Sequence, residues 1–234
     1  MNDVLSRLQG GLVVSCQAYP GEPMRDSRTM TQIAQACVVG GAAGIRAQGI
    51  ADLELITAAV DVPVIGLWKD GDGGVFITPT LDHALAVAAT GCAIVAVDGT
   101  RRPRPDGRTL AEVIAGVKDR YPEVLIMADA GSADDARAAQ DAGADILGTT
   151  LSGYTGERPR SVGPDLDLVA EIAGFAARPL IVEGRVHTPQ QAAEAMKAGA
   201  FAVCVGTAIT HPSTITGWFA GAVARHAPPE SPPV

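Results

Sequence analysis

Short apolar runs recur along the chain at a nearly constant spacing, and alanine-rich stretches separate them. Some runs follow a Gly-Ala-type turn, others begin at or near a proline, and the two kinds alternate. A repeat of this period indicates a fold built from similar supersecondary units. The runs lie at 12–15, 41–45, 63–66, 91–95, 122–126, 143–147, 179–182 and 199–203.

These runs are rich in Val and Ile and bounded by turn residues, as is typical of fully buried parallel strands. The stretches between them have helical spacing, as at 109–120 and 188–197. Ser132 and Thr188 stand where helix N-caps are expected, and Pro189 suits a first helical position. Eight β/α units of this size predict an α/β protein with a single (β/α)8 TIM barrel.

A doubly wound sheet would also alternate strands and helices, but it usually opens with a Gly-x-Gly-x-x-Gly turn. No such string occurs in this chain, so the barrel is favoured. We expect the barrel to span residues 1–226. The Pro-rich end, 227–234, is expected to be a disordered tail, because its prolines cannot continue a helix.

Composition argues against several classes of partner. The net charge of −8 does not favour binding to nucleic acid or to an anionic membrane surface. No apolar run approaches the ~20 residues of a transmembrane helix, and the N-terminus lacks the features of a signal peptide. The four cysteines lack CxxC spacing, and the histidines and cysteines lack zinc-ligand spacing. We therefore expect a cytoplasmic protein without a metal site.

Polar residues directly follow nearly every buried run. In a TIM barrel, the residues at the carboxyl ends of the strands face the active site. An ordinary transition from strand to solvent accounts for some of these residues. It does not readily account for the charged residues Lys69, Asp129 and Glu183, which follow the odd-numbered third, fifth and seventh runs. Arg46 follows the neighbouring second run. The strand-end residues are Cys16, Gln17, Arg46, Lys69, Asp98, Asp129, Thr149, Thr150, Glu183, Gly206 and Thr207.

Lys69 follows an apolar run that ends in Trp68 and precedes a Gly- and Asp-rich loop. A lysine in a barrel mouth is partly desolvated, and this lowers its pKa, as would a cationic neighbour such as Arg46. The alternative is a surface lysine in a mobile loop. The loop lacks the further acidic ligands of an EF-hand, which argues against calcium.

The last two units predict a phosphate site. Gly184 and Arg185 follow the seventh run, and Gly206 and Thr207 follow the eighth. Barrels often bind phosphate with the loops after these two strands, where glycine lets backbone N–H groups approach the oxygens. Arg185 and Thr207 would add side-chain donors. The alternative is that both glycines belong to ordinary strand-to-helix turns.

Several strings resemble the N-acetylmannosamine-6-phosphate 2-epimerase family, and the resemblance extends from Gly10 to about Phe219. The strings are 10–18, 20–23, 44–47, 77–80, 102–107, 127–129, 149–155, 183–189 and 205–210. Two positions depart from the family pattern. Many members have arginine where this chain has His211. An Arg and a Tyr often follow the lysine in the family, and the corresponding loop of this chain, 69–74, lacks both.

The resemblance implies a cofactor-independent barrel enzyme that interconverts N-acetylmannosamine 6-phosphate and N-acetylglucosamine 6-phosphate in sialic acid catabolism. It also implies a homodimer. Lys69 matches the catalytic lysine of the family and Glu183 matches its acidic partner. Residues expected to hold the sugar are Gln17, Arg46, Asp129 and Thr150.

Epimerisation at C2 requires a proton that is acidic only next to a carbonyl, so the sugar is expected to react as its open-chain aldehyde through an enolate. Lys69 would remove this proton, and Glu183 would handle protons at the ring oxygen and O1 or return one to the opposite face. Two alternatives remain: another phosphosugar isomerase, and a sugar-phosphate-binding barrel that has lost catalysis.

Overall fold

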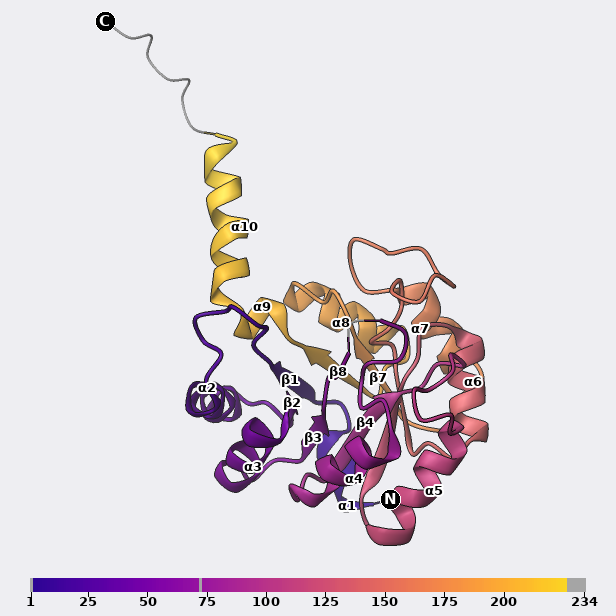
Figure 1. The fold of residues 1–234 in the computed structure, drawn as a ribbon. Coiled ribbons are helices and arrows are strands. Elements are labelled where there is room, and N and C mark those ends of the chain that lie inside the picture. The colour runs from indigo at the N-terminus through magenta and orange to yellow at the C-terminus, as the bar shows by residue number, and fades with distance from the viewer. Residues whose placement is uncertain (1, 72, 227–234) are drawn as a thin grey trace, which may run out of the picture.

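The eight apolar runs form the strands of a closed parallel barrel (Figure 1). The computed structural model describes residues 2–71 and 73–226, so the predicted tail at 227–234 lies outside the described residues. Neighbouring strands pair in sequence order, and β8 pairs with β1 to close the barrel. The predicted TIM barrel is confirmed. The strands are β1 (Leu12–Cys16), β2 (Gly44–Gln48), β3 (Val64–Leu67), β4 (Ile94–Asp98), β5 (Leu125–Asp129), β6 (Ile146–Gly148), β7 (Leu180–Glu183) and β8 (Ala202–Val205).

Most of the described helices begin at a side chain that accepts from one of their first N–H groups. The two predicted caps are present, since Ser132 accepts from Asp135 N–H and Thr188 accepts from Gln191 N–H. Pro189 occupies the first turn that follows Thr188. The helices are α1 (Asp3–Leu8), α2 (Ser27–Val39), α3 (Ile50–Ala59), α4 (Leu81–Ala89), α5 (Leu110–Arg120), α6 (Ala133–Asp141), α7 (Leu166–Ala173), α8 (Pro189–Lys197), α9 (Thr207–Thr210) and α10 (Pro212–Ala224).

Alternation along the strands divides the apolar side chains between two cores. One core lies inside the barrel and includes Val13, Ile65 and Met127. The other lies between the barrel and the surrounding helices. Because side chains two residues apart point to the same face, the inward-facing series continues at the carboxyl ends into polar residues. Ile181 is thus followed by Glu183 and Met127 by Asp129.

The amino end of the barrel is closed by α1. Leu8 is fully buried and belongs to the interior core, with Val4 and Leu5 packed against it. A Cβ on Gly44 would approach a methyl carbon of Leu8 to 2.6 Å, so glycine is needed where β2 passes this side chain. The carboxyl end is therefore the open end of the barrel interior.

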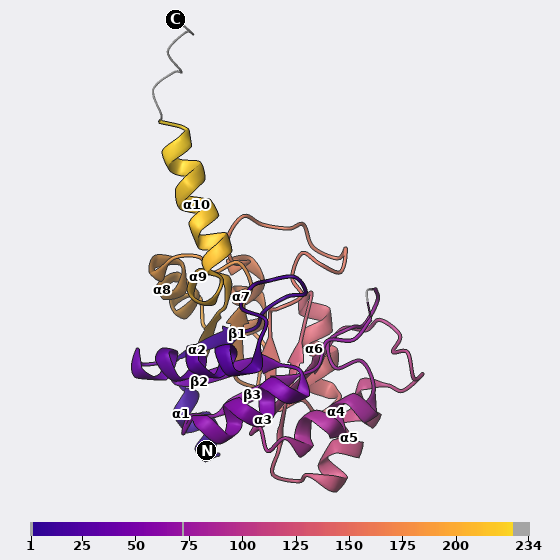
Figure 2. The same ribbon diagram turned by 60° about the vertical axis from the view of Figure 1, so that its left-hand side comes forward.

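The last helix departs from the barrel pattern. Figures 1 and 2 show α10 projecting away from the barrel beyond α9. No residue of α10 is buried, although the helix carries no charged side chain. Trp218, Phe219 and Val223 are all exposed. Among the described residues, no helix has both the length and the apolar character required to cross a membrane.

Replacing the side chain that closes the amino end should destabilise the whole barrel. We expect Leu8→Ala to lower the free energy of unfolding by ~2–5 kcal/mol, because it removes buried methyl groups and leaves a cavity. Leu55→Ala on α3 is the matched control, since Leu55 is 43% exposed, and it should cost under ~1 kcal/mol. Urea denaturation measures both values. Equal losses in the two variants would contradict the closing role of Leu8.

Candidate active site

A cavity of about 320 Å³ opens at the carboxyl end of the barrel. This volume is within the range of small-molecule sites. The cavity brings together side chains from the ends of strands on opposite sides of the barrel. All predicted site residues except Asp129 line it: Gln17, Arg46, Lys69, Thr150, Glu183, Gly184, Arg185, Gly206 and Thr207.

Arg46, from β2, lies at the floor of the cavity and is only 1% exposed. Its Nη1 and Nη2 donate to Asp129 Oδ1 and Oδ2 at 3.1 and 2.6 Å, and Nη1 also lies 3.0 Å from Glu183 Oε2. Burial alone would lower the pKa of Arg46, but the charge of Asp129, and then that of Glu183, raises it above its ordinary value. Asp129 is thus placed directly beneath the cavity as the ion-pair partner of Arg46.

Thr150 links the two carboxyl groups. Its Oγ1 lies 2.8 Å from Asp129 Oδ1 and 2.9 Å from Glu183 Oε2. A hydroxyl group carries one proton, so Thr150 shares it between the two carboxyl oxygens. Burial raises the pKa of Glu183, and the nearby charge of Asp129 adds to this effect against the opposing charge of Arg46. The hydroxyl of Thr150 donates to Glu183 Oε2, and this hydrogen bond lowers the pKa of Glu183 against the larger effect of burial.

Lys69 stands at the start of the segment that joins β3 to α4. The backbone of Lys69 bridges to Ile77, and Asp70 N–H donates to Phe76 C=O at 3.0 Å, so the segment folds back on itself as a hairpin. Burial lowers the pKa of Lys69 to about 8, and the charge of Arg46 contributes, while Glu183 and Asp129 oppose the shift. The lowered pKa expected from the sequence agrees with this environment.

Asp98 ends β4 but does not line the cavity. Its N–H donates to Ile77 C=O at 2.9 Å, so the hairpin after β3 lies over this strand end. Its carboxylate accepts from Thr100 N–H and from Arg102 Nη2 at 2.9 and 2.7 Å. Asp98 therefore organises the loop after β4.

The loops after β7 and β8 lie side by side at the cavity. Gly184 has φ of 113°, a conformation that favours glycine, and Arg185 follows at φ of 55°. Gly206 precedes the short helix α9, and Thr207 begins it. These residues form one wall of the cavity.

The guanidinium group of Arg185 is bonded to the loop after β6. Its Nε donates to Gly163 C=O, its Nη1 to Ser152 C=O and its Nη2 to Ser161 Oγ, at 3.1, 2.8 and 3.0 Å. Tyr154 of the same loop lies with its ring centroid 5.6 Å from Arg185 Cζ. In this arrangement Arg185 anchors the loop beside the cavity.

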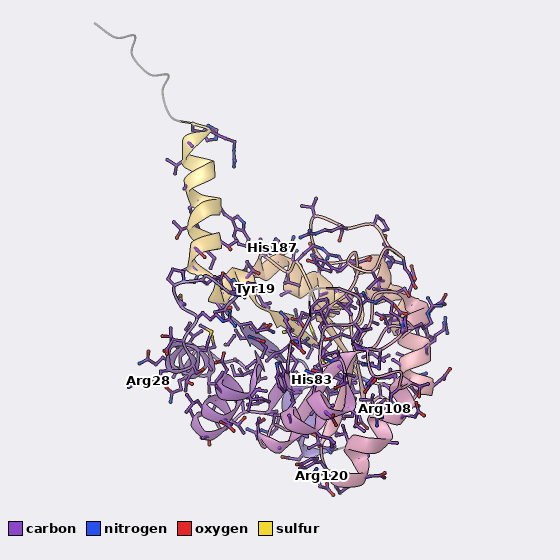
Figure 3. The ribbon with its side chains drawn as sticks, in the orientation of Figure 1. Tyr19, Arg28, His83, Arg108, Arg120 and His187 are labelled. Carbon is purple, nitrogen blue, oxygen red and sulfur yellow. The ribbon has the colours of Figure 1, made fainter. Side chains whose placement is uncertain are left out.

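Several cavity residues were not proposed as site residues from the sequence, notably Tyr19, Tyr154, His187 and His211. Figure 3 shows Tyr19 and His187 at the end of the barrel from which α10 projects, far from Arg120 at the other end. Tyr19 lies two positions after the predicted substrate residue Gln17, and this proximity in sequence could have identified it as a cavity residue. The directions of these side chains depend on loop conformation and could not be read from spacing.

The described residues contain no cluster of side chains suited to bind a metal ion. Within residues 2–71 and 73–226, no three His, Cys, Asp or Glu side chains lie close enough together to hold a metal ion.

The Gln17 side chain is 6% exposed, and its Nε2 donates to Ser15 Oγ at 3.0 Å. Its Oε1 has no hydrogen-bond partner among the described residues, so it is available to a ligand donor.

The effects of substitutions at Arg46 and at Asp129 on stability should be strongly coupled. We expect Arg46→Met to cost ~3–5 kcal/mol of unfolding free energy, because Asp129 would remain buried without its main partner. The double variant Arg46→Met/Asp129→Leu should lose much less than the sum of the single losses. Arg108→Ala is a control at an exposed pair and should cost under ~1 kcal/mol. Additive losses at Arg46 and Asp129, measured by urea denaturation, would contradict this coupling.

Comparison with known proteins agrees with the fold and extends over nearly the whole chain. A family model described as NanE, "Putative N-acetylmannosamine-6-phosphate epimerase", matches residues 30–225. A protein of Cutibacterium acnes with the description "Putative N-acetylmannosamine-6-phosphate 2-epimerase" is 56% identical over 222 residues, which cover 94% of this chain and 96% of the relative. A protein of Caldanaerobacter subterraneus with the same description is 42% identical over 219 residues, which cover 93% and 92% of the two chains.

A solved structure supports the same grouping. The N-acetylmannosamine-6-phosphate 2-epimerase from Clostridium perfringens superposes with a TM-score of 0.89 at 36% sequence identity. The match covers 93% of this chain and 95% of that one. The chain therefore belongs to the NanE family of N-acetylmannosamine-6-phosphate epimerases.

Proposed function

We propose that this protein is an isomerase that inverts C2 of N-acetylmannosamine 6-phosphate to give N-acetylglucosamine 6-phosphate in sialic acid and amino-sugar catabolism. Family membership supports the substrate class. The observation that carries the chemistry is a desolvated amine, Lys69, in the same cavity as the Arg46–Glu183 pair. A phosphorylated sugar is charged and does not cross a bilayer unaided, so we place this activity in the cytoplasm.

The reaction needs a base for a weakly acidic carbon. The C2 proton becomes removable when the sugar opens to its aldehyde, because the resulting charge then spreads to O1 as an enolate. With a pKa of about 8, about a tenth of Lys69 is neutral amine at pH 7, against well under a hundredth for an ordinary lysine. Lys69 is thus poised to accept the C2 proton.

Glu183 and Arg46 suit the oxygen side of the reaction. Burial raises the pKa of Glu183, and in its protonated form it can donate to the ring oxygen or to O1 as the ring opens and closes. It can also return a proton to the opposite face of C2. Arg46 lies beneath with its charge held in place by Asp129, and supplies a fixed positive potential for the developing enolate.

Substrate binding would use the remaining polar groups of the cavity. Gln17 Oε1 can accept from a hydroxyl or from the acetamido N–H, because it has no partner among the described residues. Thr150 would hold the sugar beside Glu183. The N–H groups of the turns at Gly184 and Gly206, with the hydroxyl of Thr207, would hold the phosphate, and Arg185 would support that wall. Binding energy from the phosphate would then orient C2.

Proton NMR of the purified protein with N-acetylmannosamine 6-phosphate in D2O tests this function. We expect conversion to N-acetylglucosamine 6-phosphate with solvent deuterium at C2. Lys69→Met should reduce turnover at least ~10³-fold, because no other group would take the proton, while ligand affinity stays within a few fold.

Lys197→Met is the matched control, because Lys197 is exposed at the end of α8, and it should remain fully active. Ligand binding without turnover in the wild-type protein would instead support the non-catalytic barrel. Turnover without deuterium at C2 would exclude the enolate route. Retained turnover in Lys69→Met would overturn the role of Lys69.

We also propose that the barrel spans residues 1–226 and works as a homodimer in which two copies exchange α10. A helix of 13 residues without a charged side chain and without a buried residue is poorly suited to water. The corresponding helix of a TIM barrel normally packs against the eighth strand. Since α10 leaves its own barrel (Figure 2), the element shaped for that position is α10 of a second copy. Reciprocal exchange gives a closed twofold assembly.

Light scattering coupled to size-exclusion chromatography tests the exchange. We expect the wild-type protein at twice the chain mass of 23.9 kDa. Phe219→Glu should shift it to the monomer mass, because it puts a charge on the apolar face of α10. Val39→Glu is the control, since Val39 is 91% exposed at the end of α2, and it should remain dimeric. A monomeric wild-type protein, or a dimeric Phe219→Glu variant, would contradict the proposal.

A further inference from the structure

The amine of Lys69 lies over the face of an aromatic ring. Its Nζ is 5.0 Å from the centroid of Tyr19, and both residues line the cavity. Among the described residues, no carboxylate lies within salt-bridge distance of this nitrogen. The ring face is thus a direct contact through which the protein can favour the charged form of Lys69.

Tyr19 is half-exposed in the loop after β1, yet its position is closely defined. Its N–H donates to Glu22 Oε2 at 2.7 Å, and Glu22 Oε1 lies 3.2 Å from His211 Nδ1. The His211 ring in turn packs against the Tyr19 ring, with centroids 5.4 Å apart. These three contacts form a closed circuit that joins the loop after β1 to the start of α10. The circuit restrains the backbone and the ring of Tyr19 relative to His211.

The ring attracts the ammonium form of Lys69 and not the neutral amine, because its negative π-face interacts with charge. Burial raises the pKa of the Tyr19 hydroxyl, and Glu183 adds to this effect, so the ring is neutral in the working range. Other charged or titratable groups act on the pair, and the ring contact adds to their effects. Those that act on Lys69 or Tyr19 are Arg46, Asp129, Glu183, Glu22 and Tyr154.

We propose that Tyr19, held by Glu22 and His211, is a positioning residue that keeps the Lys69 amine over the cavity and stabilises it once it carries a proton. In the reaction, the C2–H bond breaks, its electron pair enters the enolate, and the proton forms a new N–H bond at Nζ. The ring contact is strongest in that protonated state, so it lowers the energy of the intermediate relative to the starting amine. The reaction step rests on the proposed function, whereas the contact itself can be tested without substrate.

The pH dependence of kcat separates this role from a structural one. Lys69 must be neutral to act, so kcat should rise with pH through about 8. Tyr19→Leu removes the attraction for the ammonium, so the pKa of Lys69 falls. The rising limb of the pH profile of kcat should therefore shift to lower pH by about half to one unit. The plateau should fall about three- to tenfold, because a weaker base takes the proton less readily. KM should change less than kcat.

Two variants serve as controls for this experiment. Tyr19→Phe keeps the ring face, so its pH limb and plateau should match those of the wild type within twofold. Tyr154→Leu removes another half-exposed tyrosine from the same cavity, one that lies over Arg160 and Arg185, and should leave the limb in place. A limb that stays fixed in Tyr19→Leu, or that moves equally in Tyr154→Leu, would overturn the positioning role.

A substrate-free measurement distinguishes failure of this proposal from failure of the proposed function. The chain has three lysines, Lys69, Lys118 and Lys197. Carbon-13 lysine labelling therefore gives few signals, and Lys69→Met assigns one of them. The Lys69 signal should titrate near pH 8 in the wild type and lower in Tyr19→Leu, with Tyr19→Phe unchanged. If the wild type does not turn over substrate, the proposed function fails and this titration alone decides the positioning role.

His211 should act on Lys69 only through Tyr19. His211→Ala should move the Lys69 titration in the same direction as Tyr19→Leu, but by less, because the ring is loosened and not removed. The double variant Tyr19→Leu/His211→Ala should match Tyr19→Leu alone. Additive shifts would show that His211 acts on Lys69 directly and would overturn the circuit.

Discussion

The guanidinium of Arg46, almost completely withdrawn from water, determines how the open end of the barrel is arranged. Removing such a charge from water costs several kcal/mol unless partners in good geometry compensate it. Asp129 supplies two hydrogen bonds and Glu183 a further contact, from strands on other sides of the barrel. The cation therefore ties β2, β5 and β7 together under the cavity.

This single charge has opposite consequences for its two functional neighbours. It disfavours a second cation, and together with burial it brings Lys69 to a pKa of about 8. It lowers the pKa of Glu183, but burial outweighs this effect and the charge of Asp129 adds to burial, so the pKa of Glu183 stays raised while its carboxyl group accepts from Thr150. Burial and one ion-pair network thus shift the pKa values of the proposed base and the proposed acid in one cavity.

Around this centre, the loops have separate tasks. The hairpin after β3 carries Lys69 and covers the end of β4, where Asp98 is used to hold its own loop. The loop after β6 is anchored by Arg185, which ties it to the predicted phosphate wall. Tyr19 and His211 connect the loop after β1 with the root of α10. An exchanged α10 would therefore place the dimer contact close to the residues that position Lys69.

The sequence alone determined the strands, the helix caps at Ser132 and Thr188, and which strands end in charged residues, because these depend on periodicity and local hydrogen bonding. Alternation was enough to bring Lys69, Arg46 and Glu183 to one end of one barrel. Only the tertiary structure decided that Asp129 lies beneath the cavity, that Arg185 bonds a loop and that α10 leaves the barrel. These outcomes depend on loop conformation and on contacts such as Tyr19 with His211, between residues far apart in the chain, which local pattern does not encode.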